Sequence, residues 1–452
     1  MNRLLPLEIL LLLGMVGAPS IASADEPAPR VLHLDDAVRI AHDHQPSVLN
    51  ARALTNAAAG RITEARAAYL PQVTGTALAE RVHSRSVSST SATSPTTGTA
   101  GAGTTGTTGI GGSGAIPTYD VFSVGLNASQ LIWDFGTTIN RTRAATAGRD
   151  AQEAAEHTTE LQIALQVRRA FFQAHAQHAL VKVGEESVQN FERHLGQITG
   201  FVEQGIRPEI DLAQARTDLA NSKVTLINAR NGYSIAKAQL NQAMGVVGPT
   251  DYDVADEDIG VLPGEDGPST DLAKTALDTR PEIVTLRRQQ RAAQLTLTAV
   301  KGAYGPTLSA VGAISEAGVQ LDALGTNWNV GLVLSWPLFQ GGLTTGQVRE
   351  AQGNLDAAGA QIAQEELAVR LEVEQGLLDV QSAKVVISAA REALTNAKEQ
   401  LRLAEGRYES GVGSIIELGD AQVAAANAAA QDVQAEYSLA SARAELLSAL
   451  GR

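Results

Sequence analysis

Few side chains in this sequence are spaced in a way that could support chemistry. His175 and His178 lie three residues apart, which would place two imidazoles on one face of a helix, but no third metal ligand follows in register. His42 and His44 form a second pair with the same shortcoming. Cysteine is absent, and we find no Ser/His/Asp arrangement and no paired carboxylates suited to acid–base catalysis. We therefore predict that the protein is not an enzyme and uses neither a cofactor nor a metal.

A glycine-rich segment is the remaining candidate for ligand chemistry. Residues 109–114 read Gly-Ile-Gly-Gly-Ser-Gly, but no strand leads into them and no helix follows, which disfavours a nucleotide cradle. They belong to a Ser/Thr/Gly run at 84–116 that is typical of a low-complexity loop. The formal net charge of −14 disfavours nucleic acid as a partner, because a protein that follows a phosphate backbone should be basic.

The first residues have the pattern of a secretory signal. Arg3 gives a basic start, residues 9–18 are apolar, and the Ala-Ser-Ala sequence at 22–24 fits a small-residue cleavage site. We predict a signal peptide at 1–24. No other stretch reaches ~18 consecutive apolar residues, so the sequence predicts no transmembrane helix. An exported chain of this kind either stays in the periplasm or enters a membrane as a β-barrel.

The chain contains an internal duplication. Pro46 recurs as Pro281, 235 residues later, whereas Gly205 recurs as Gly411, 206 residues later. The change in spacing falls within the Ser/Thr/Gly run, which therefore lengthens only the first copy. The predicted segments are a first repeat at 25–245 with a long loop at 84–118, an acidic linker at 246–270 and a second repeat at 271–452.

Each repeat is predicted to contain the same elements in the same order. A short helix comes first, and then a helix that begins with proline, where the missing N–H is harmless. A β-hairpin, a very long helix, a tight glycine turn and a return helix follow. The predicted short and proline-started helices cover 36–44, 46–68, 271–279 and 281–303, and the return helices cover 209–244 and 415–450. Each return helix is about half as long as its partner, so the proline-started helix could lie end to end with it.

The four predicted strands alternate apolar and polar residues. The apolar positions are Val73, Gly75, Ala77 and Ala79; Phe122, Val124, Leu126, Ala128 and Ile132; Leu308, Ala310, Gly312 and Ile314; and Val330, Leu332, Leu334, Trp336 and Leu338. Segments of about ten residues with one apolar side suit strands between lipid and a wet lumen. Trp133, Trp328 and Trp336 lie in or beside these strands, as interfacial girdles do. The edge of a soluble β-sandwich is the alternative.

Four strands cannot close into a barrel, and an open sheet edge is not tolerated in lipid. If the strands are inserted, several copies must share one barrel. Two copies would give eight strands and a filled interior, whereas three would give twelve and leave room for a channel.

Heptads run through the two long helices. The apolar positions are Val181, Gly184, Val188, Phe191, Leu195, Ile198 and Val202 in the first, and Ile387, Ala390, Leu394, Ala397, Leu401, Ala404 and Tyr408 in the second. Sustained heptads predict supercoiled helices with a continuous seam. Helices that extend for about 100 Å are too long to be buried against a single partner.

This order of elements, given twice, resembles the TolC family of outer-membrane efflux proteins. The similar stretches are 34–38, 67–71, 124–126, 338–342 and, most clearly, 408–418. The resemblance covers the mature chain except the Ser/Thr/Gly loop. It implies a mostly α-helical chain with a small membrane β-barrel portion, four strands per chain and two structural repeats. It also implies a homotrimer in which a 12-strand barrel continues into a 12-helix periplasmic tube.

The implied function is an exit duct in the cell outer membrane that extends into the periplasm. Such a duct would serve a tripartite efflux or type I secretion system and move substrates from the periplasm to the outside without chemistry. The implied partners are a periplasmic adaptor (membrane fusion) protein, an inner-membrane transporter and outer-membrane lipid. Inner coiled coils would close the end of the tube until the partners dock. A periplasmic coiled-coil scaffold is the alternative, which explains the heptads but leaves the hairpins unexplained.

The resemblance also assigns residues to the periplasmic tips. Adaptor docking is expected at Gly205, Ile206, Arg207, Gly411, Val412 and Gly413. Glycine at a helix–helix turn also has an ordinary role, because it accommodates a positive φ. Some family members have a tip arginine that pairs with the other repeat where this chain has Gly413, and Arg207 on the opposite turn is a possible substitute.

Acidic residues near the aperture match family positions too. Three copies each of Asp211, Glu417 and Asp420 would form carboxylate rings, which favour cations. The simpler explanations are that Glu417 completes a capping box with Ser414 and that Asp211 lies in a favourable first turn. Tyr408 matches an aromatic position associated with the closed state, but it is also the last heptad residue.

Overall fold

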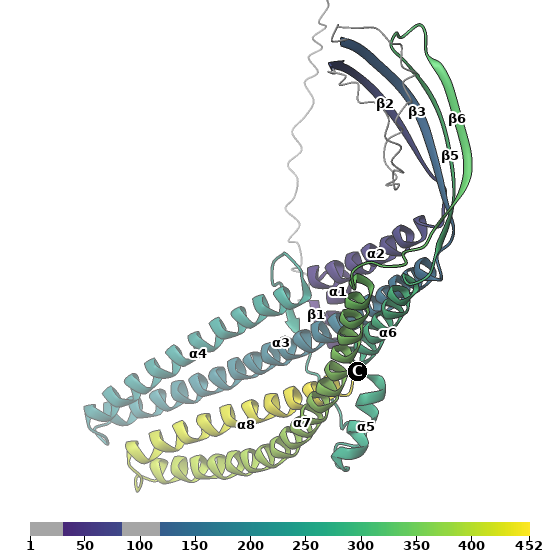
Figure 1. Cartoon of the computed structure of the whole chain (residues 1–452). Helices are drawn as coiled ribbons and strands as arrows, with labels where there is room; N and C mark the ends of the chain where they lie inside the picture. The colour runs from purple at the N-terminus through teal and green to yellow at the C-terminus, as the bar shows by residue number, and fades with distance from the viewer. Residues whose placement is uncertain (1–29, 84–117) are drawn as a thin grey trace, which may run out of the picture.

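The computed structural model describes residues 30–83 and 118–452. The molecule is elongated, with a curved sheet at one end and two pairs of long helices at the other (Figure 1). The first half contains β1 (Arg30–Leu32), α1 (Leu34–His44), α2 (Pro46–Ala67), β2 (Gln72–His83), β3 (Thr118–Trp133), α3 (Thr137–Glu203) and α4 (Glu209–Met244). The second half contains β4 (Tyr252–Val254), α5 (Ser269–Thr279), α6 (Pro281–Gly302), β5 (Thr307–Gly318), β6 (Gly325–Ser335), α7 (Leu343–Glu409) and α8 (Ile415–Ala449). The chain is mostly helical.

The four long strands form one antiparallel sheet in the order β2-β3-β5-β6. Its register sets Gly75 opposite Leu126, Leu126 opposite Ile314 and Ile314 opposite Trp328. The predicted apolar positions that lie within this register therefore share one face. Large exposed side chains on this face are Val73, Val124, Leu126, Ile314, Trp328, Val330, Leu332 and Leu334. In the single chain, the apolar face of the sheet is thus exposed.

The first hairpin differs from the sequence prediction in two details. The register of β3 against β5 shifts between Leu131 and Trp133, so Trp133 rather than Ile132 lies opposite Leu308. A bulge inserts one residue and changes the side-chain phase, which strict alternation cannot reveal. Strand β3 begins at Thr118, which the predicted loop at 84–118 had included. The rest of that loop and the predicted signal at 1–24 lie outside the described residues.

Helices α3 and α7 contain 67 residues each, which corresponds to about 100 Å of helix. Helix α3 pairs with α4, and α7 pairs with α8 (Figure 1). The heptad seam of α3 is largely buried, and a Cβ added to Gly184 would lie 3.2 Å from Leu226 Cδ1. The small residue therefore lets α4 approach closely. Within the described parts of the chain, no helix is both long enough and apolar enough to cross a membrane.

The proline-started helices lie end to end with the return helices. The side-chain amide of Gln45, just before α2, donates to the carbonyls of Gln242 and Ala243 at 3.2 and 3.0 Å. Gly245 follows α4 with φ 70°, and a Cβ there would lie 2.7 Å from the Cα of Gln45. The junction therefore requires glycine. In the second half, the Thr279 hydroxyl donates to the Leu450 carbonyl at 3.0 Å.

The segment predicted as a linker, 246–270, packs against the body of the chain. Strand β4 pairs in parallel with β1. Farther along, Glu265 is only 1% exposed and accepts hydrogen bonds from Arg443 at 3.1 and 3.2 Å and from the Leu262 N–H at 2.9 Å. Lys384 Nζ lies 2.6 Å from the same carboxylate. These contacts, called here the Glu265 clamp, fix the segment to α7 and α8.

Candidate functional site

The two helix pairs end beside one another, far from the sheet (Figure 1). Each pair turns on a glycine with positive φ, Gly205 at 71° and Gly411 at 78°. In the first turn, the N–H of Gly205 donates to Val202 O and that of Ile206 to Phe201 O, both at 2.9 Å. The second turn has the equivalent pair of bonds at 3.0 Å. Both are Schellman motifs, which satisfy the last carbonyls of a helix and require a left-handed residue.

Arg207 connects the two turns. Its guanidinium carbon lies 4.7 Å from the centroid of the Tyr408 ring, and its Nη2 donates to the carbonyl of Gly413 at 3.2 Å. A Cβ at position 413 would lie 2.9 Å from the backbone N of Tyr408, so this turn requires glycine at the position where some family members have an arginine. The contact between the two halves therefore runs from an arginine of the first turn to a main-chain oxygen of the second.

A small core holds the tips together. Tyr408 is 1% exposed and packs with residues from all four long helices. The other buried members of this cluster are Ile198, Ala215, Ala404, Leu418 and Ala421. The ring of His194 meets Tyr408 edge-on, with centroids 5.1 Å apart. Burial raises the pKa of the Tyr408 hydroxyl, with a further rise from Asp211 and an opposing effect of Arg207.

The three carboxylates predicted at the aperture lie in different environments. Glu417 is paired with Arg407, whose Nε lies 3.0 Å from Oε1, and its N–H is capped by Ser414 Oγ at 3.1 Å. Asp420 is exposed, one turn farther along α8. Asp211 is only 7% exposed, in the first turn of α4. Glu417 and Asp420 are therefore exposed to solvent, whereas Asp211 is largely shielded within the single chain.

The outermost side chains of both turns are aliphatic. Ile206 and Val412, at equivalent positions of the two repeats, are 60% and 72% exposed. One turn farther, Ile210 and Ile416 are 73% and 68% exposed. Four exposed aliphatic residues beside polar ones make the tips suitable for contact with another protein.

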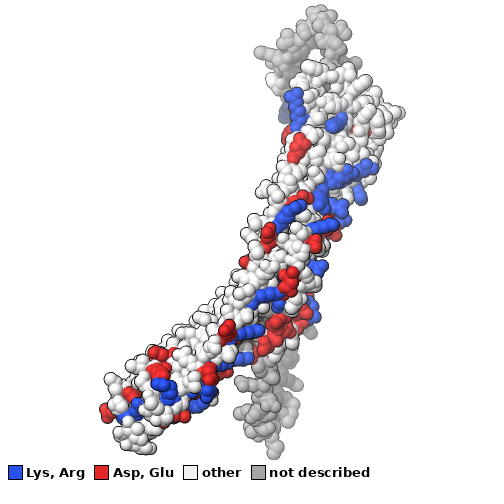
Figure 2. Space-filling model, turned by 90° about the horizontal axis from the view of Figure 1, so that it is seen from below, with Lys and Arg blue, Asp and Glu red and all other residues white. Residues whose placement is uncertain are grey.

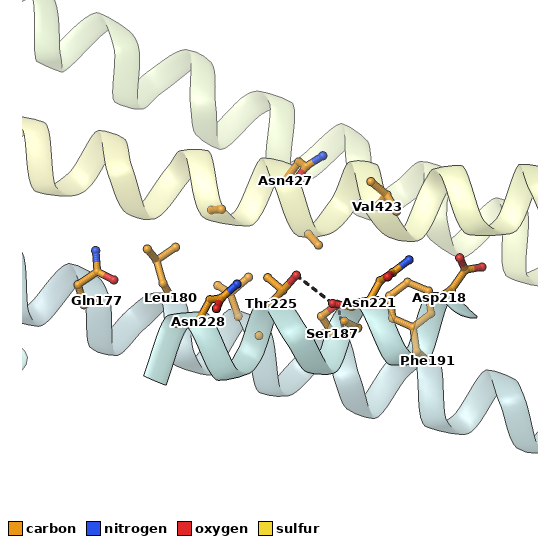
Figure 3. A pocket seen from close by; sticks show the side chains of 16 residues that line it. Gln177, Leu180, Ser187, Phe191, Asp218, Asn221, Thr225, Asn228, Val423 and Asn427 are labelled. Atoms are coloured by element: carbon orange, nitrogen blue, oxygen red, sulfur yellow. Dashed lines mark hydrogen bonds between the residues drawn. The ribbon is translucent and has the colours of Figure 1, made fainter. Parts of the chain in front are cut away.

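A groove of about 470 Å³ lies between the α3–α4 pair and α8. Its apolar part includes Leu180, Phe191 and Val423, and the polar residues Asn221 of α4 and Asn427 of α8 also line it (Figure 3). It extends from the vicinity of the tips toward the middle of the helices. On the face seen in Figure 2, acidic and basic side chains alternate along the helices and are far fewer over the sheet.

The histidines considered as metal ligands have other partners. His175 Nε2 lies 2.9 Å from Asp256 Oδ1, and His178 stacks on Tyr233 with ring centroids 5.0 Å apart. His42 Nε2 lies 2.9 Å from Glu160 Oε1, whereas His44 Nδ1 contacts a main-chain carbonyl of its own helix. Within the described residues, no group of three potential ligands is placed to hold a metal.

Sequence reasoning missed two residues of this site. His194 lies between the heptad positions Phe191 and Leu195, and its only sequence signal is a position beside the seam. Arg407 precedes the last heptad residue and gave no signal of its pairing with Glu417. Both belong to contacts between elements that the sequence alone does not bring together.

Known proteins of similar sequence belong to one family. Residues 37–246 and 272–452 match the family model described as outer membrane efflux protein. The probable outer membrane lipoprotein SilC of Salmonella typhimurium is 24% identical over 320 residues, which is 68% of each chain. The outer membrane protein TolC of Escherichia coli is 26% identical over 346 residues, 73% of this chain and 69% of TolC. The alignments span about two thirds of each relative.

Two solved structures share the fold. A crystal structure of CusC has a TM-score of 0.76 at 20% identity and covers 92% of this chain and 91% of its own. The outer membrane protein VceC of Vibrio cholerae has a TM-score of 0.74 at 20% identity and covers 92% and 96%. At these identities, the likeness establishes the fold of the chain.

Proposed function

This chain belongs to the outer membrane efflux protein family, and we propose that three copies of it form an exit duct from the periplasm to the outside. The family is non-enzymatic and resides in the outer membrane. The duct would serve a tripartite efflux or type I secretion system. The observation that carries the proposal is the open, curved sheet whose apolar face is exposed.

The sheet needs other copies of itself. Strands β2 and β6 are its two edges, and each edge presents a row of hydrogen-bonding groups. Lipid cannot satisfy these groups, so a membrane sheet must close. Three copies would contribute twelve strands, enough for a barrel with an aqueous lumen.

The tryptophans support insertion into a bilayer. Trp328 lies near the outer end of β6 and Trp336 just beyond its inner end, and both are exposed. Eight residues of strand span about 26 Å, which matches the apolar band of about 25 Å in outer-membrane barrels. The two residues would therefore mark the two interfaces.

The helices would form the periplasmic part. Each chain supplies two long helices and two composite rods, so three chains would build a tube of twelve helical rods. The tips of this tube would meet the adaptor through Gly205, Ile206, Arg207, Gly411, Val412 and Gly413, where exposed aliphatic residues support docking. The inner-membrane transporter would complete the assembly.

The tip residues would also set what passes the aperture. Rings of Glu417 and Asp420 would favour cations, because closely spaced carboxylates concentrate positive charge. Asp211 would add a weaker, shielded ring. Tyr408 would hold the closed arrangement through its contact with Arg207.

Reconstitution tests this function directly. The purified chain should form trimers that resist detergent, and these should conduct ions in planar bilayers. The runner-up function, a periplasmic coiled-coil scaffold, would conduct nothing. A chain recovered wholly soluble and monomeric after cell fractionation would overturn the duct.

A further inference from the structure

One contact at the tips contains a titratable group that the duct itself does not explain. His194 on α3 is 6% exposed, and its ring meets that of Tyr408 on α7 at an interplanar angle of 64°. Arg207 lies over the same tyrosine ring. Tyr408 is therefore in contact with both the helix and the turn of the first repeat, and His194 is part of the joint between repeats.

The joint leaves polar atoms without partners. Among the described residues, three buried side-chain atoms have no hydrogen bond, and two of these are His194 Nε2 and the Tyr408 hydroxyl. The Nδ1–H of His194 donates to Gln197 Oε1 at 3.3 Å, so in the neutral ring Nε2 is a bare acceptor. Water would satisfy both atoms if α3 and α7 separated. In this joint the two polar atoms therefore have no protein partner.

Charged groups surround the joint. His194 and Tyr408 line a cavity of about 100 Å³ together with Arg193 of α3 and Glu405 and Glu409 of α7. Helix α8 contributes the apolar Leu418 to the cavity, and Asp218 of α4 acts from farther away. Burial lowers the pKa of His194, and this outweighs the raising effects of Gln197, Asp218 and Glu409.

We propose that His194 is a pH-sensitive contact at the tip of the duct. Its protonation separates α3 from α7 and favours the open state. A proton on Nε2 would create a buried N–H without a protein acceptor. It would also add a positive charge to a ring that contacts Tyr408, over which the cationic guanidinium of Arg207 already lies. The effector is therefore mild acidity of the periplasm. Histidine is the side chain suited to this range.

The direction follows from proton linkage. In the closed joint the pKa of His194 is lowered, and in water it would return to about 6.5. The closed state is therefore fully favoured above this value and weakens as the pH falls below it. Each His194 that must be protonated changes the open-to-closed ratio by up to about tenfold per pH unit. This inference rests on the proposed duct, in which three copies act together.

A pH series in planar bilayers provides the test. We expect the conductance of the wild-type trimer to rise severalfold between about pH 7.5 and pH 5.5, on either side of the ordinary histidine pKa. His194→Gln and His194→Phe should abolish this rise. His178→Gln is the matched control, because burial also lowers the pKa of His178 and its ring also contacts a tyrosine, but within the α3–α4 pair. It should keep the rise.

A second measurement follows the distance between the two turns and does not depend on conductance. The natural chain has no cysteine, so nitroxide labels on Ile206→Cys and Val412→Cys report one distance per labelled chain when diluted with unlabelled chains. This distance should lengthen in acid with His194 and stay constant with His194→Gln. An unchanged distance, or a pH response that survives His194→Gln, overturns the inference. Absence of conductance at every pH together with an acid-induced lengthening instead overturns only the duct.

Discussion

At the scale of single residues, the tip combines groups that hold the two repeats together with groups that face solvent. Arg207 stacks on the ring of Tyr408, whereas Glu417 and Asp420 are exposed to solvent. Arg407 Nε lies 3.0 Å from Glu417 Oε1 and offsets part of the carboxylate charge. Within the described residues Asp420 forms no ion pair, so it contributes the larger uncompensated charge.

Neutralising both exposed carboxylates should reduce cation selectivity. We expect Glu417→Gln combined with Asp420→Asn to lower the cation-to-anion permeability ratio on the order of a few-fold, because the focused negative potential is removed. Reversal potentials in a salt gradient measure this ratio. Asp211→Asn is the buried comparison and should change it less. Unchanged ratios in the double variant would remove the site assignment and leave the fold intact.

At the scale of elements, the turns and the Glu265 clamp determine how the long helices are held. The two Schellman turns fix the direction in which each return helix starts, and the clamp attaches the segment between the repeats to α7 and α8. Neither feature depends on the membrane, so both can be tested by the stability of the purified protein.

Two glycines close to each other in sequence should respond to alanine in opposite ways. Gly411→Ala places a Cβ at φ 78°, which should destabilise the tip by about 1 kcal/mol, although no atom lies within 4 Å. Gly406→Ala lies within α7 in open space and should stabilise the helix by up to about 1 kcal/mol. Thermal unfolding of the two variants measures the difference. Equal melting temperatures would contradict a conformational role for Gly411.

The Glu265 clamp should weaken in acid. Burial opposes ionisation of Glu265, but the hydrogen bonds from Lys384, Arg443 and the Leu262 N–H outweigh it and lower the pKa of the carboxyl. The stabilisation is therefore present above the unfolded value of about 4.3 and is lost as the pH falls through the lowered pKa. The melting temperature should fall over that interval.

Removing the clamp carboxylate isolates its contribution. Glu265→Ala leaves the guanidinium of Arg443, 7% exposed, without its buried partner, which should cost about 3–5 kcal/mol. It should also flatten the acid dependence of melting. Combining it with Arg443→Met should recover part of the stability, since the unpaired charge is removed too. A double variant no more stable than Glu265→Ala would argue against a buried ion pair.

At the scale of the whole molecule, our proposal that several copies assemble rests on the sheet. One face of the sheet is apolar and exposed, and its two edges are β2 and β6. The helices are arranged as two rods per repeat, which pack along one another but leave the sheet uncovered (Figure 1). A single copy therefore presents surfaces that a membrane and other copies would cover.

Opposite faces of β6 should tolerate charge differently. Leu332 lies on the apolar face, where an arginine near the bilayer midplane costs about 2–4 kcal/mol. Asn329 points to the other face, toward the proposed lumen. We expect Leu332→Arg to reduce the amount of detergent-resistant trimer in the outer-membrane fraction severalfold and Asn329→Arg to leave it unchanged. Similar losses in both variants would contradict the assignment of faces.

Local patterns predicted much of the structure. The alternation around Leu126 and Trp328 indicated strands with one apolar face, and the heptads from Val181 to Val202 indicated a long coiled coil. Such patterns arise because every turn or pleat repeats the same environment, so residue type alone reports it. Glycines at turns were also predictable, because a positive φ excludes most other residues.

Contacts between distant segments were decided only by the tertiary structure. Neither the stacking of Arg207 on Tyr408 nor the pairing of Glu265 with Arg443 has a periodic signal, because each depends on where two long elements meet. The bulge before Trp133 and the burial of His194 have the same origin. Sequence by itself determined which elements form and which sides are apolar, since these depend on near neighbours in the chain. Folding decided which charged and aromatic side chains come together at the tips, since these depend on packing across hundreds of residues.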